Sequence, residues 1–311
     1  MELPAEHPVR ITHPKKVLWP EAGITKLDLL RYYAQVAPAL LSWLRDRPLT
    51  VIRYPNGIHG HSFFQKDAPQ GRPEWVRTHA VWSEEKRRHI DCVIVDSVAT
   101  LLWLGNLGCL ELHVGFTTAA RPEEPTHVAF DLDPSVPGFE PVRTVALGLH
   151  QLLQRLNLPS VCKTSGASGL QVFIKLAEGH TYEHTRVFTR AVAEYLQHQF
   201  PSLVTLERLT RNRRHKVYVD YPQHGRHRTL IAAYSPRAAE QATVSTPLSW
   251  RELEQGALPT DYTLRNVPTR LKLTGDLMTQ LEPVSLRDIS AYLERAGVFP
   301  ERCGSRPGLH V

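Results

Sequence analysis

The chain has 311 residues, of which 42% are hydrophobic and 22% are charged, and this composition excludes a disordered or fibrous protein. Lys and Arg number 37 against 31 Asp and Glu, so the net charge is +6, which suits a polyanionic partner without establishing one. The four cysteines form no CxxC pair, and this argues against a zinc site or a disulfide framework.

Neither a targeting signal nor a membrane span is expected. The start, MELPAEHPVR, lacks the basic-then-apolar pattern of a signal peptide. No apolar run reaches the roughly 18–20 residues that a spanning helix needs. Because the cysteines also indicate a reducing compartment, we expect a soluble, cytoplasmic protein.

The N-terminal part is expected to begin with a helix. Thr25 is typical of an N-cap and Asp28 of a first helical turn. An apolar stripe at helical spacing continues to Leu44, although Pro38 is expected to bend or split the helix. Three elements are predicted to follow: a strand at 47–55, a helix at 98–107 and a strand at 110–114.

The middle of the chain mixes neighbouring strands with helices. The predicted order is a strand ending at Asp133, a helix at 141–156, strands at 160–164 and 170–176, a helix at 182–199, and strands at 216–221 and 228–234. Such an order favours an α+β fold over a doubly wound parallel sheet. We expect one domain over 1–300, made of an N-terminal α/β subdomain to about 110, a catalytic core over about 110–245 and a helical segment over about 246–300, followed by a flexible tail at 301–311.

Two aspartates stand at the end of the strand HVAFDLDP. Side chains alternate in a strand, so Asp131 and Asp133 point the same way and Leu132 points into the opposite layer. Two carboxylates on one face repel unless a cation lies between them or one takes a proton. The pattern alone fits a divalent metal clamp and a strand end that begins a turn about equally well.

A third aspartate, Asp220, ends the later strand KVYVD and favours a metal site. Three aspartates on strands could complete a two-metal centre of the polymerase type. The surrounding segment is strongly basic and could contact phosphates or be a solvated face. Its basic residues are Arg208, Arg211, Arg213, Arg214, Lys216, Arg226 and Arg228.

Other candidates are ambiguous when they are considered singly. The loop SGASG (165–169) could cradle a phosphate, with Ser165 donating a hydrogen bond, but a tight hairpin turn is the simpler interpretation. His113 lies on the polar face of its strand, where histidines are usually structural. Phe63 and Phe64 would normally be core residues, although one of them could stack on a base.

Taken in order, these segments resemble the primase-polymerase domain of bacterial DNA ligase D. This is the branch of the archaeo-eukaryotic primase superfamily that acts in non-homologous end joining. The similar segments are ITHPKKVLWPEAGITKLDLLRYY, RYPNGIHGHSFFQK, LELHV, VAFDLDPS, KTSGASGLQVF, KVYVDYPQ, IAAYSPRA and STPLSWREL. The resemblance implies a primase-type core of mixed or antiparallel sheet with flanking helices. It also implies a template-dependent nucleotidyltransferase that fills gaps or extends DNA ends, with a preference for ribonucleotides as in relatives.

The resemblance also implies roles for individual residues. Asp131, Asp133 and Asp220 would be catalytic and would bind Mn²⁺ or Mg²⁺ at a two-metal site. The nucleotide, and chiefly its triphosphate, would be contacted by His113, Ser165, Gly166, Gln223 and Arg237, with Phe64 and Arg53 near a base and Lys16 and Lys26 on a DNA 5′-phosphate. The implied partners are DNA with ends or gaps, nucleoside triphosphates, a Ku-type end-binding protein and a separate DNA ligase. The implied location is the nucleoid region of a bacterial cytoplasm.

The loop departs from the pattern SGxKGLH that is usual in this family. Ser168 and Gln171 stand where that pattern has lysine and histidine. A serine replaces a charge-assisted donor with a neutral one, so weaker nucleotide binding, altered sugar preference or lost activity would follow. We expect Arg226 and Arg228 to be the candidates that supply the missing charge, with Arg228 as a nucleotide ligand.

Three functions are therefore compared. The first is an active polymerase of the kind described above. The second is a DNA-end-binding module of the same fold with weakened catalysis. The third is a DxD phosphatase with Asp131 as nucleophile and Asp133 as acid/base, and it is disfavoured because the later Asp276 has no partner acid four residues on.

Overall fold

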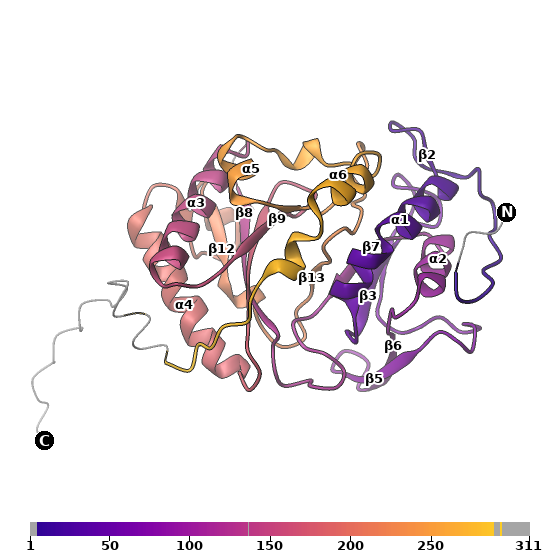
Figure 1. The fold of residues 1–311 in the computed structure, drawn as a ribbon, viewed down its shortest axis with the longest axis horizontal. Coiled ribbons are helices and arrows are strands. Elements are labelled where there is room, and N and C mark those ends of the chain that lie inside the picture. The colour runs from indigo at the N-terminus through magenta and orange to yellow at the C-terminus, as the bar shows by residue number, and fades with distance from the viewer. Residues whose placement is uncertain (1–4, 136, 289–292, 294–311) are drawn as a thin grey trace, which may run out of the picture.

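The structure is a computed structural model that describes residues 5–135, 137–288 and 293. Figure 1 shows two groups of elements side by side. One contains β8, β9, β12, α3 and α4, and the other contains α1, α2, β3 and β7. Each group is built on its own sheet, and the expected α+β class is confirmed.

The larger sheet has six strands in the order β11-β12-β8-β10-β9-β14. Neighbours are antiparallel except for the parallel pair β11–β12. Helices α3 (Glu140–Arg155) and α4 (Tyr182–Gln199) both contact β8. The strands are β11 (Val204–Thr205), β12 (Val217–Asp220), β8 (His127–Pro134), β10 (Leu170–Lys175), β9 (Val161–Thr164) and β14 (Pro247–Leu248).

These helices cover one face of the sheet because every second side chain of β8 is apolar and points toward them. Phe130 meets Phe188 of α4 with ring centroids 6.2 Å apart. Leu132 is fully buried. The intervening residues of β8, including Asp131 and Asp133, therefore project from the other face.

The smaller sheet is antiparallel, with the order β13-β7-β3-β4. Its strands are β13 (Leu230–Ile231), β7 (Cys109–Val114), β3 (Leu49–Arg53) and β4 (Phe63–Gln65). Helices α1 (Lys26–Leu44) and α2 (Val98–Asn106) pack together beside it, and Tyr33 Oη of α1 donates to Cys109 O at 2.9 Å. Two hairpins complete this group: β1 (Val17–Trp19) with β2 (Ile24–Thr25), and β5 (Thr78–Ser83) with β6 (Arg88–Val93).

The chain passes from the smaller sheet to the larger and returns. Strand β7 precedes the larger sheet in sequence, and β13 comes back to pair with β7 after β12 is complete. The division expected near residue 110 therefore falls inside the smaller sheet, since β7 and β13 belong to it. The chain therefore leaves the larger sheet at Asp220, the end of β12, and enters the smaller sheet at Leu230, the start of β13.

The C-terminal segment contains short helices, as expected. They are α5 (Trp250–Glu254), η3 (Pro259–Asp261), α6 (Val267–Thr274) and η4 (Leu277–Gln280); two more 3₁₀ turns, η1 (Thr210–Asn212) and η2 (Tyr221–Gln223), flank β12. The expected tail at 301–311 lies outside the described residues. Within the described part of the chain, none of the helices combines the length and the apolarity that crossing a membrane requires.

The start of α1 confirms the predicted cap. Thr25 Oγ1 accepts a hydrogen bond from the Asp28 backbone N–H at 3.3 Å, and Asp28 Oδ2 accepts one from the Thr25 N–H at 2.9 Å. Of the bend or split expected at Pro38, the split does not occur, since α1 runs without interruption from Lys26 to Leu44. Burial of the apolar stripe on both sides of Pro38 offsets the hydrogen bond that proline cannot make.

The strand predicted at 228–234 is wrong in length, since β13 covers only Leu230–Ile231. The backbone turns on either side of it. His227 and Tyr234 have φ angles of 58° and 67°, in the left-handed region that extended strands do not occupy.

Candidate active site

The predicted aspartates lie together on the open face of the larger sheet. Asp131 is directly opposite Asp220 of β12, and Asp133 is opposite Tyr218. Side chains of directly opposed residues in an antiparallel pair share one face. The strand register therefore brings all three carboxylates to one place, which their separation in sequence did not require.

Electrostatics at this place are unfavourable without a cation. Burial raises the pKa of Asp131 to about 7 and the charge of Asp133 adds to the rise, while a hydrogen bond from Gln171 opposes it. Burial and the charge of Asp220 also raise the pKa of Asp133, against the attraction of Arg213 and Arg237. Three clustered oxygen donors of this kind suit a hard divalent ion such as Mg²⁺ or Mn²⁺.

The carboxylates are not closed into a ligand cluster. Among the described residues, no three Asp, Glu, His or Cys side chains are drawn together tightly enough to hold a metal ion as they stand. Asp220 Oδ1 is engaged elsewhere: it accepts hydrogen bonds from Tyr218 Oη at 3.1 Å and from the Gln223 N–H at 3.0 Å, as the cap of η2. The three carboxylates fit a divalent ion chemically, since such ions prefer oxygen ligands.

The loop SGASG forms the turn between antiparallel strands β9 and β10, so the hairpin interpretation is confirmed. Ser165 Oγ accepts hydrogen bonds from the backbone N–H groups of Ala167 at 3.2 Å and Gly169 at 3.1 Å. Its own hydroxyl proton remains available for donation, whereas Ser168 is exposed. A Cβ on Gly169 would lie 2.8 Å from Leu132 O, so glycine lets this turn approach the end of β8.

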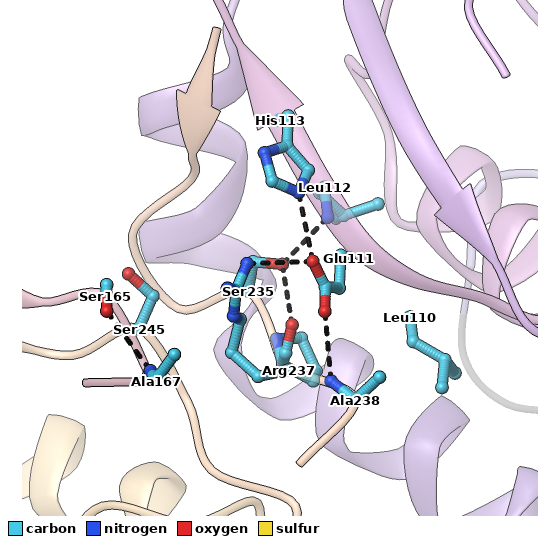
Figure 2. Close-up of polar contacts among 12 residues, drawn as sticks. Leu110, Glu111, Leu112, His113, Ser165, Ala167, Ser235, Arg237, Ala238 and Ser245 are labelled. Carbon is cyan, nitrogen blue, oxygen red and sulfur yellow. Dashed lines mark hydrogen bonds and ion pairs between the residues drawn. The ribbon is translucent and has the colours of Figure 1, made fainter. Parts of the chain in front are cut away.

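Glu111 organises a second polar cluster, which Figure 2 shows between β7 and the segment at 235–238. Its buried carboxylate accepts from Arg237 Nη1 at 2.8 Å and from the Ala238 N–H at 3.1 Å, and His113 Nε2 lies 3.2 Å away. Burial alone would raise the pKa of Glu111, but hydrogen bonding by His113 and the charge of Arg237 hold it below its usual value. Sequence reasoning missed this role, although Glu111 is two residues before His113 and so shares its strand face.

Arg237 joins the two clusters. Its guanidinium pairs with Glu111 and also lowers the pKa of Asp133. Its backbone carbonyl accepts from Trp19 Nε1 at 3.0 Å. Gly166, with φ of +72°, packs against it so closely that a Cβ there would lie 2.5 Å from Arg237 Cγ. The predicted residues His113, Gly166 and Arg237 are thus brought to one side of the carboxylates.

The basic segment contributes in two different ways. Arg213 lies over the ring of Tyr218, with Cζ 4.1 Å from the centroid, next to the carboxylates. Arg226 instead forms an ion pair with Glu123, and both side chains are more than half exposed. That Arg226 supplies the charge that the loop at 165–169 lacks stays a prediction.

Gln223 and Arg228 lie beyond Asp220. The side-chain Nε2 of Gln223 donates to Thr229 O at 2.8 Å, which braces the turn after η2. Arg228 is exposed and lines a cavity of about 340 Å³ together with Lys66, Trp82 and Tyr182. This cavity opens between the β5–β6 hairpin and the start of β13.

Lys16 and Lys26 form a cationic pocket at the start of α1. Lys16 Nζ donates to Pro55 O at 2.6 Å and to Asn56 Oδ1 at 2.8 Å. Lys26 Nζ donates to Thr12 O and Asn106 O, both at 2.9 Å. Burial and the nearby Lys16 charge lower the pKa of Lys26. Each ammonium has three donors, so one on each lysine has no partner within the described structure.

The aromatic pair lies close to this pocket on β4. Phe64 is 71% exposed, so the usual core assignment is wrong for it. Arg53 lies over Phe63, with Cζ 5.2 Å from the ring centroid, and donates to Leu107 O and Gln65 Oε1. Arg53 therefore holds β4 against β3 at the edge of the sheet, while the ring of Phe64 stays exposed to solvent. Asn106 and Leu107, adjacent in the chain, connect the lysine pocket to this edge.

Lys163 is a further charged residue, and sequence reasoning did not single it out. It lies on β9 with no exposed surface, two strands away from Asp131. Burial lowers its pKa to about 7, against the attraction of Asp131. A lysine within the apolar run VCKT was the available signal.

Comparison with known proteins gives consistent results. The family model described as "LigD, primase-polymerase domain" matches residues 25–278. The bifunctional non-homologous end joining protein LigD of Bacillus subtilis is 40% identical over 272 residues, which cover 86% of this chain and 43% of that protein. The multifunctional non-homologous end joining DNA repair protein LigD of Mycobacterium tuberculosis is 32% identical, with coverage of 89% and 37%. The chain thus spans less than half the length of these curated relatives.

A solved structure matches over nearly its full length. The polymerase domain from Mycobacterium tuberculosis ligase D, in complex with DNA, superposes with a TM-score of 0.82 at 33% identity. The match covers 88% of this chain and 97% of that one.

Proposed function

Since the chain belongs to the LigD primase-polymerase domain family, we propose that it is a template-dependent nucleotidyltransferase that fills gaps or extends ends at DNA breaks. The observation that carries the proposal is the strand register that puts Asp220 opposite Asp131, beside Asp133. Arg237 and the turn at 165–169 lie next to these carboxylates. Phosphoryl transfer needs a cation site next to groups that bind anions, and this arrangement offers both.

In this proposal Asp131, Asp133 and Asp220 would hold Mg²⁺ or Mn²⁺, which would supply charge stabilisation for the attacking 3′ oxygen and the leaving pyrophosphate. The chain's own part is to orient the substrates. Arg237 is placed to neutralise triphosphate oxygens, and Glu111 fixes its position. The turn at 165–169 offers the Ser165 hydroxyl and backbone N–H groups to the same anion.

The remaining nucleotide contacts are also proposals. His113 reaches the triphosphate from β7, where Glu111 orients its ring. Gln223 would contact the nucleotide from the end of η2, where its hydrogen bond to Thr229 O holds the side chain, and Arg228 would do so from the wall of the cavity.

A DNA strand would extend from the carboxylates toward the lysine pocket. We assign a 5′-phosphate to Lys16 and Lys26, because each retains an ammonium donor, as counted above. We assign base stacking to the exposed ring of Phe64, with Arg53 supporting its strand. The proposal also includes two partners, a Ku-type end-binding protein and a separate ligase activity. It further includes a preference for ribonucleotides and a location near the bacterial nucleoid.

One observation favours a second candidate, a DNA-end-binding module with weakened catalysis. Ser168 is exposed and uncharged, and Arg226 is paired with Glu123 instead of the loop. The phosphatase interpretation is set aside because the family is that of primase-polymerases. Asp276 also caps η4 and accepts from Tyr234 Oη at 2.7 Å.

A primer-extension assay tests the function. The substrate is a gapped duplex with a 5′-phosphate, supplied with ribo- or deoxynucleotides and Mn²⁺ or Mg²⁺. We expect extension by the wild type, and a loss of about a thousandfold or more in Asp131→Asn and Asp220→Asn, because each variant removes a metal-ligating charge.

The same variants should bind the gapped DNA nearly as well as the wild type, since the carboxylates do not hold the 5′-phosphate. Tight DNA binding by the wild type with no product under any condition would favour the second candidate. Full extension by either variant would contradict the two-metal assignment.

A further inference from the structure

Lys163 is a lysine in the interior of the larger sheet. Its Nζ donates to Gln171 Oε1 and to Ser245 Oγ, the latter at 2.7 Å. Ser245 Oγ in turn donates to Thr164 O at 2.8 Å. No carboxylate of the described residues forms an ion pair with Lys163 within 4 Å, so the ammonium is satisfied by neutral oxygens. Burying a charge in this way costs stability, which points to a role other than folding.

Lys163, Gln171 and Asp131 form one row across the sheet. Lys163 of β9 is opposite Gln171 of β10, and Gln171 is opposite Asp131 of β8. Gln171 is itself almost fully buried, at 3% exposure. Its amide therefore lies between an ammonium on one side and a carboxylate on the other.

The ammonium determines which way this amide faces. A lysine ammonium can only donate hydrogen bonds, so Gln171 must turn its Oε1 toward Lys163. The Nε2 group is then the end of the amide left to face Asp131, the direct cross-strand neighbour of Gln171. With the amide reversed, a carbonyl oxygen would face the carboxylate and the two would repel.

We propose that Lys163 is a positioning residue for nucleotidyl transfer, which orients the Gln171 amide so that Nε2 holds one oxygen of Asp131 and leaves the other free for a metal ion. The proposal rests on the proposed function. Hydrogen bonds to ligating carboxylates commonly fix ligand orientation and tune metal affinity. Lys163 acts indirectly, through the Gln171 amide, and touches no substrate.

The first test replaces Lys163 with methionine, which has a similar length and no donor. Mn²⁺ affinity is measured by titration followed by electron paramagnetic resonance, and stability by thermal unfolding in EDTA. We expect Lys163→Met to weaken Mn²⁺ binding by about 10- to 100-fold. The melting temperature should change by no more than a few degrees, because removal of the buried charge is opposed by the loss of the donor to Gln171 Oε1 and Ser245 Oγ.

Lys163→Gln supplies a rescue and a second folded variant. Its amide can donate to Gln171 Oε1 without carrying charge, so Mn²⁺ affinity should stay within a few-fold of the wild type. Lys175→Met is the matched control: this lysine lies in the same sheet, but its partner on β8 is His127, away from the carboxylates. It should leave Mn²⁺ affinity unchanged.

A double-mutant cycle tests whether the effect passes through the amide. Gln171→Leu should lose as much Mn²⁺ affinity as Lys163→Met, and the double variant should lose no more than either single variant. In extension assays, Lys163→Met should lower kcat at subsaturating Mn²⁺ and leave the nucleotide KM unchanged, since Lys163 does not contact the triphosphate.

Unchanged Mn²⁺ affinity in Lys163→Met overturns the proposal, and a lower melting temperature with unchanged affinity assigns the lysine a structural role instead. Additive losses in the double variant also overturn it. If the wild type binds Mn²⁺ but extends no primer, the proposed function fails, whereas the Mn²⁺ titrations of these variants still decide the role of Lys163.

Discussion

At the scale of single residues, the site depends on how neighbours hold each reactive side chain. Glu111 fixes Arg237 and His113, and Tyr218 fixes Asp220. Asp131 is different, because burial and the charge of Asp133 act against its ionised form. Its protonation should therefore couple metal binding to pH.

The first expectation concerns stability in the absence of metal. The pKa of Asp131 rises from 3.8 to about 7 on folding, so the folded chain binds this proton more tightly than the unfolded chain. The resulting stabilisation is present below about pH 4 and is lost as pH rises toward about 7. Between about pH 5 and about pH 7.5 in EDTA, the melting temperature of the wild type should fall by a few degrees relative to Asp131→Asn.

Saturating Mn²⁺ should reverse this difference, and most strongly at the higher pH, because the ion binds the ionised carboxylate. Measuring each melting temperature relative to Asp131→Asn cancels the titration of unrelated groups. A constant difference between the two proteins across the pH range would show that Asp131 is not perturbed.

At the scale of elements, the β9–β10 hairpin determines how near the turn at 165–169, proposed to bind the triphosphate, comes to the carboxylates. Gly169 is decisive for this approach, because a side chain there would meet the backbone oxygen of Leu132 at 2.8 Å and Asp133 Oδ1 at 3.4 Å. A backbone atom cannot move aside as a flexible side chain can, so the turn would have to withdraw.

Gly169→Ala should therefore raise the nucleotide KM by about tenfold, since displaced positioning groups lose much of their effect. Steady-state extension at varied nucleotide concentration measures the change. Ala167→Ser adds one atom at an exposed position of the same turn and is expected to leave KM unchanged. Equal KM values for all three proteins would mean that the turn does not touch the nucleotide.

At the scale of the whole molecule, the candidate metal ligands and the candidate DNA contacts lie in different parts of the fold. The larger sheet bears the carboxylates, the smaller sheet bears Phe64 on β4, and the lysine pocket lies at the start of α1. Figure 1 shows the elements of the two sheets side by side. Strands β7 and β13 and the Glu111–Arg237 pair connect them. A DNA end held at the lysine pocket would thus be held relative to the carboxylates.

Lys16→Ala should reduce the preference for 5′-phosphorylated over 5′-hydroxyl gapped DNA by about tenfold, because one charge-assisted hydrogen bond to the phosphate is lost. Fluorescence anisotropy with the two DNAs measures the preference. Lys15→Ala removes the same charge from an exposed neighbouring position and should leave the preference unchanged. An equal loss of affinity for both DNAs in Lys16→Ala would reduce Lys16 to a general electrostatic contribution.

The sequence by itself was sufficient for features that depend on residues close along the chain. The cap at Thr25, the helices and the shared face of Asp131 and Asp133 follow from spacing of a few residues, because helix and strand periods repeat over that range. The order of motifs was sufficient for the family. The split allowed for at Pro38 and the full strand at 228–234 did not form, because packing and left-handed residues decided the backbone there.

Only the tertiary structure decided which distant residues meet. Glu111 and Arg237 are 126 positions apart, and Lys163 and Ser245 are 82 apart. Glu111 and Lys163 reach these contacts from strands β7 and β9, where a register shift of one residue would send each side chain to the opposite face. For the same reason, Asp220 could be recognised in the sequence as a candidate, but its place opposite Asp131 could not.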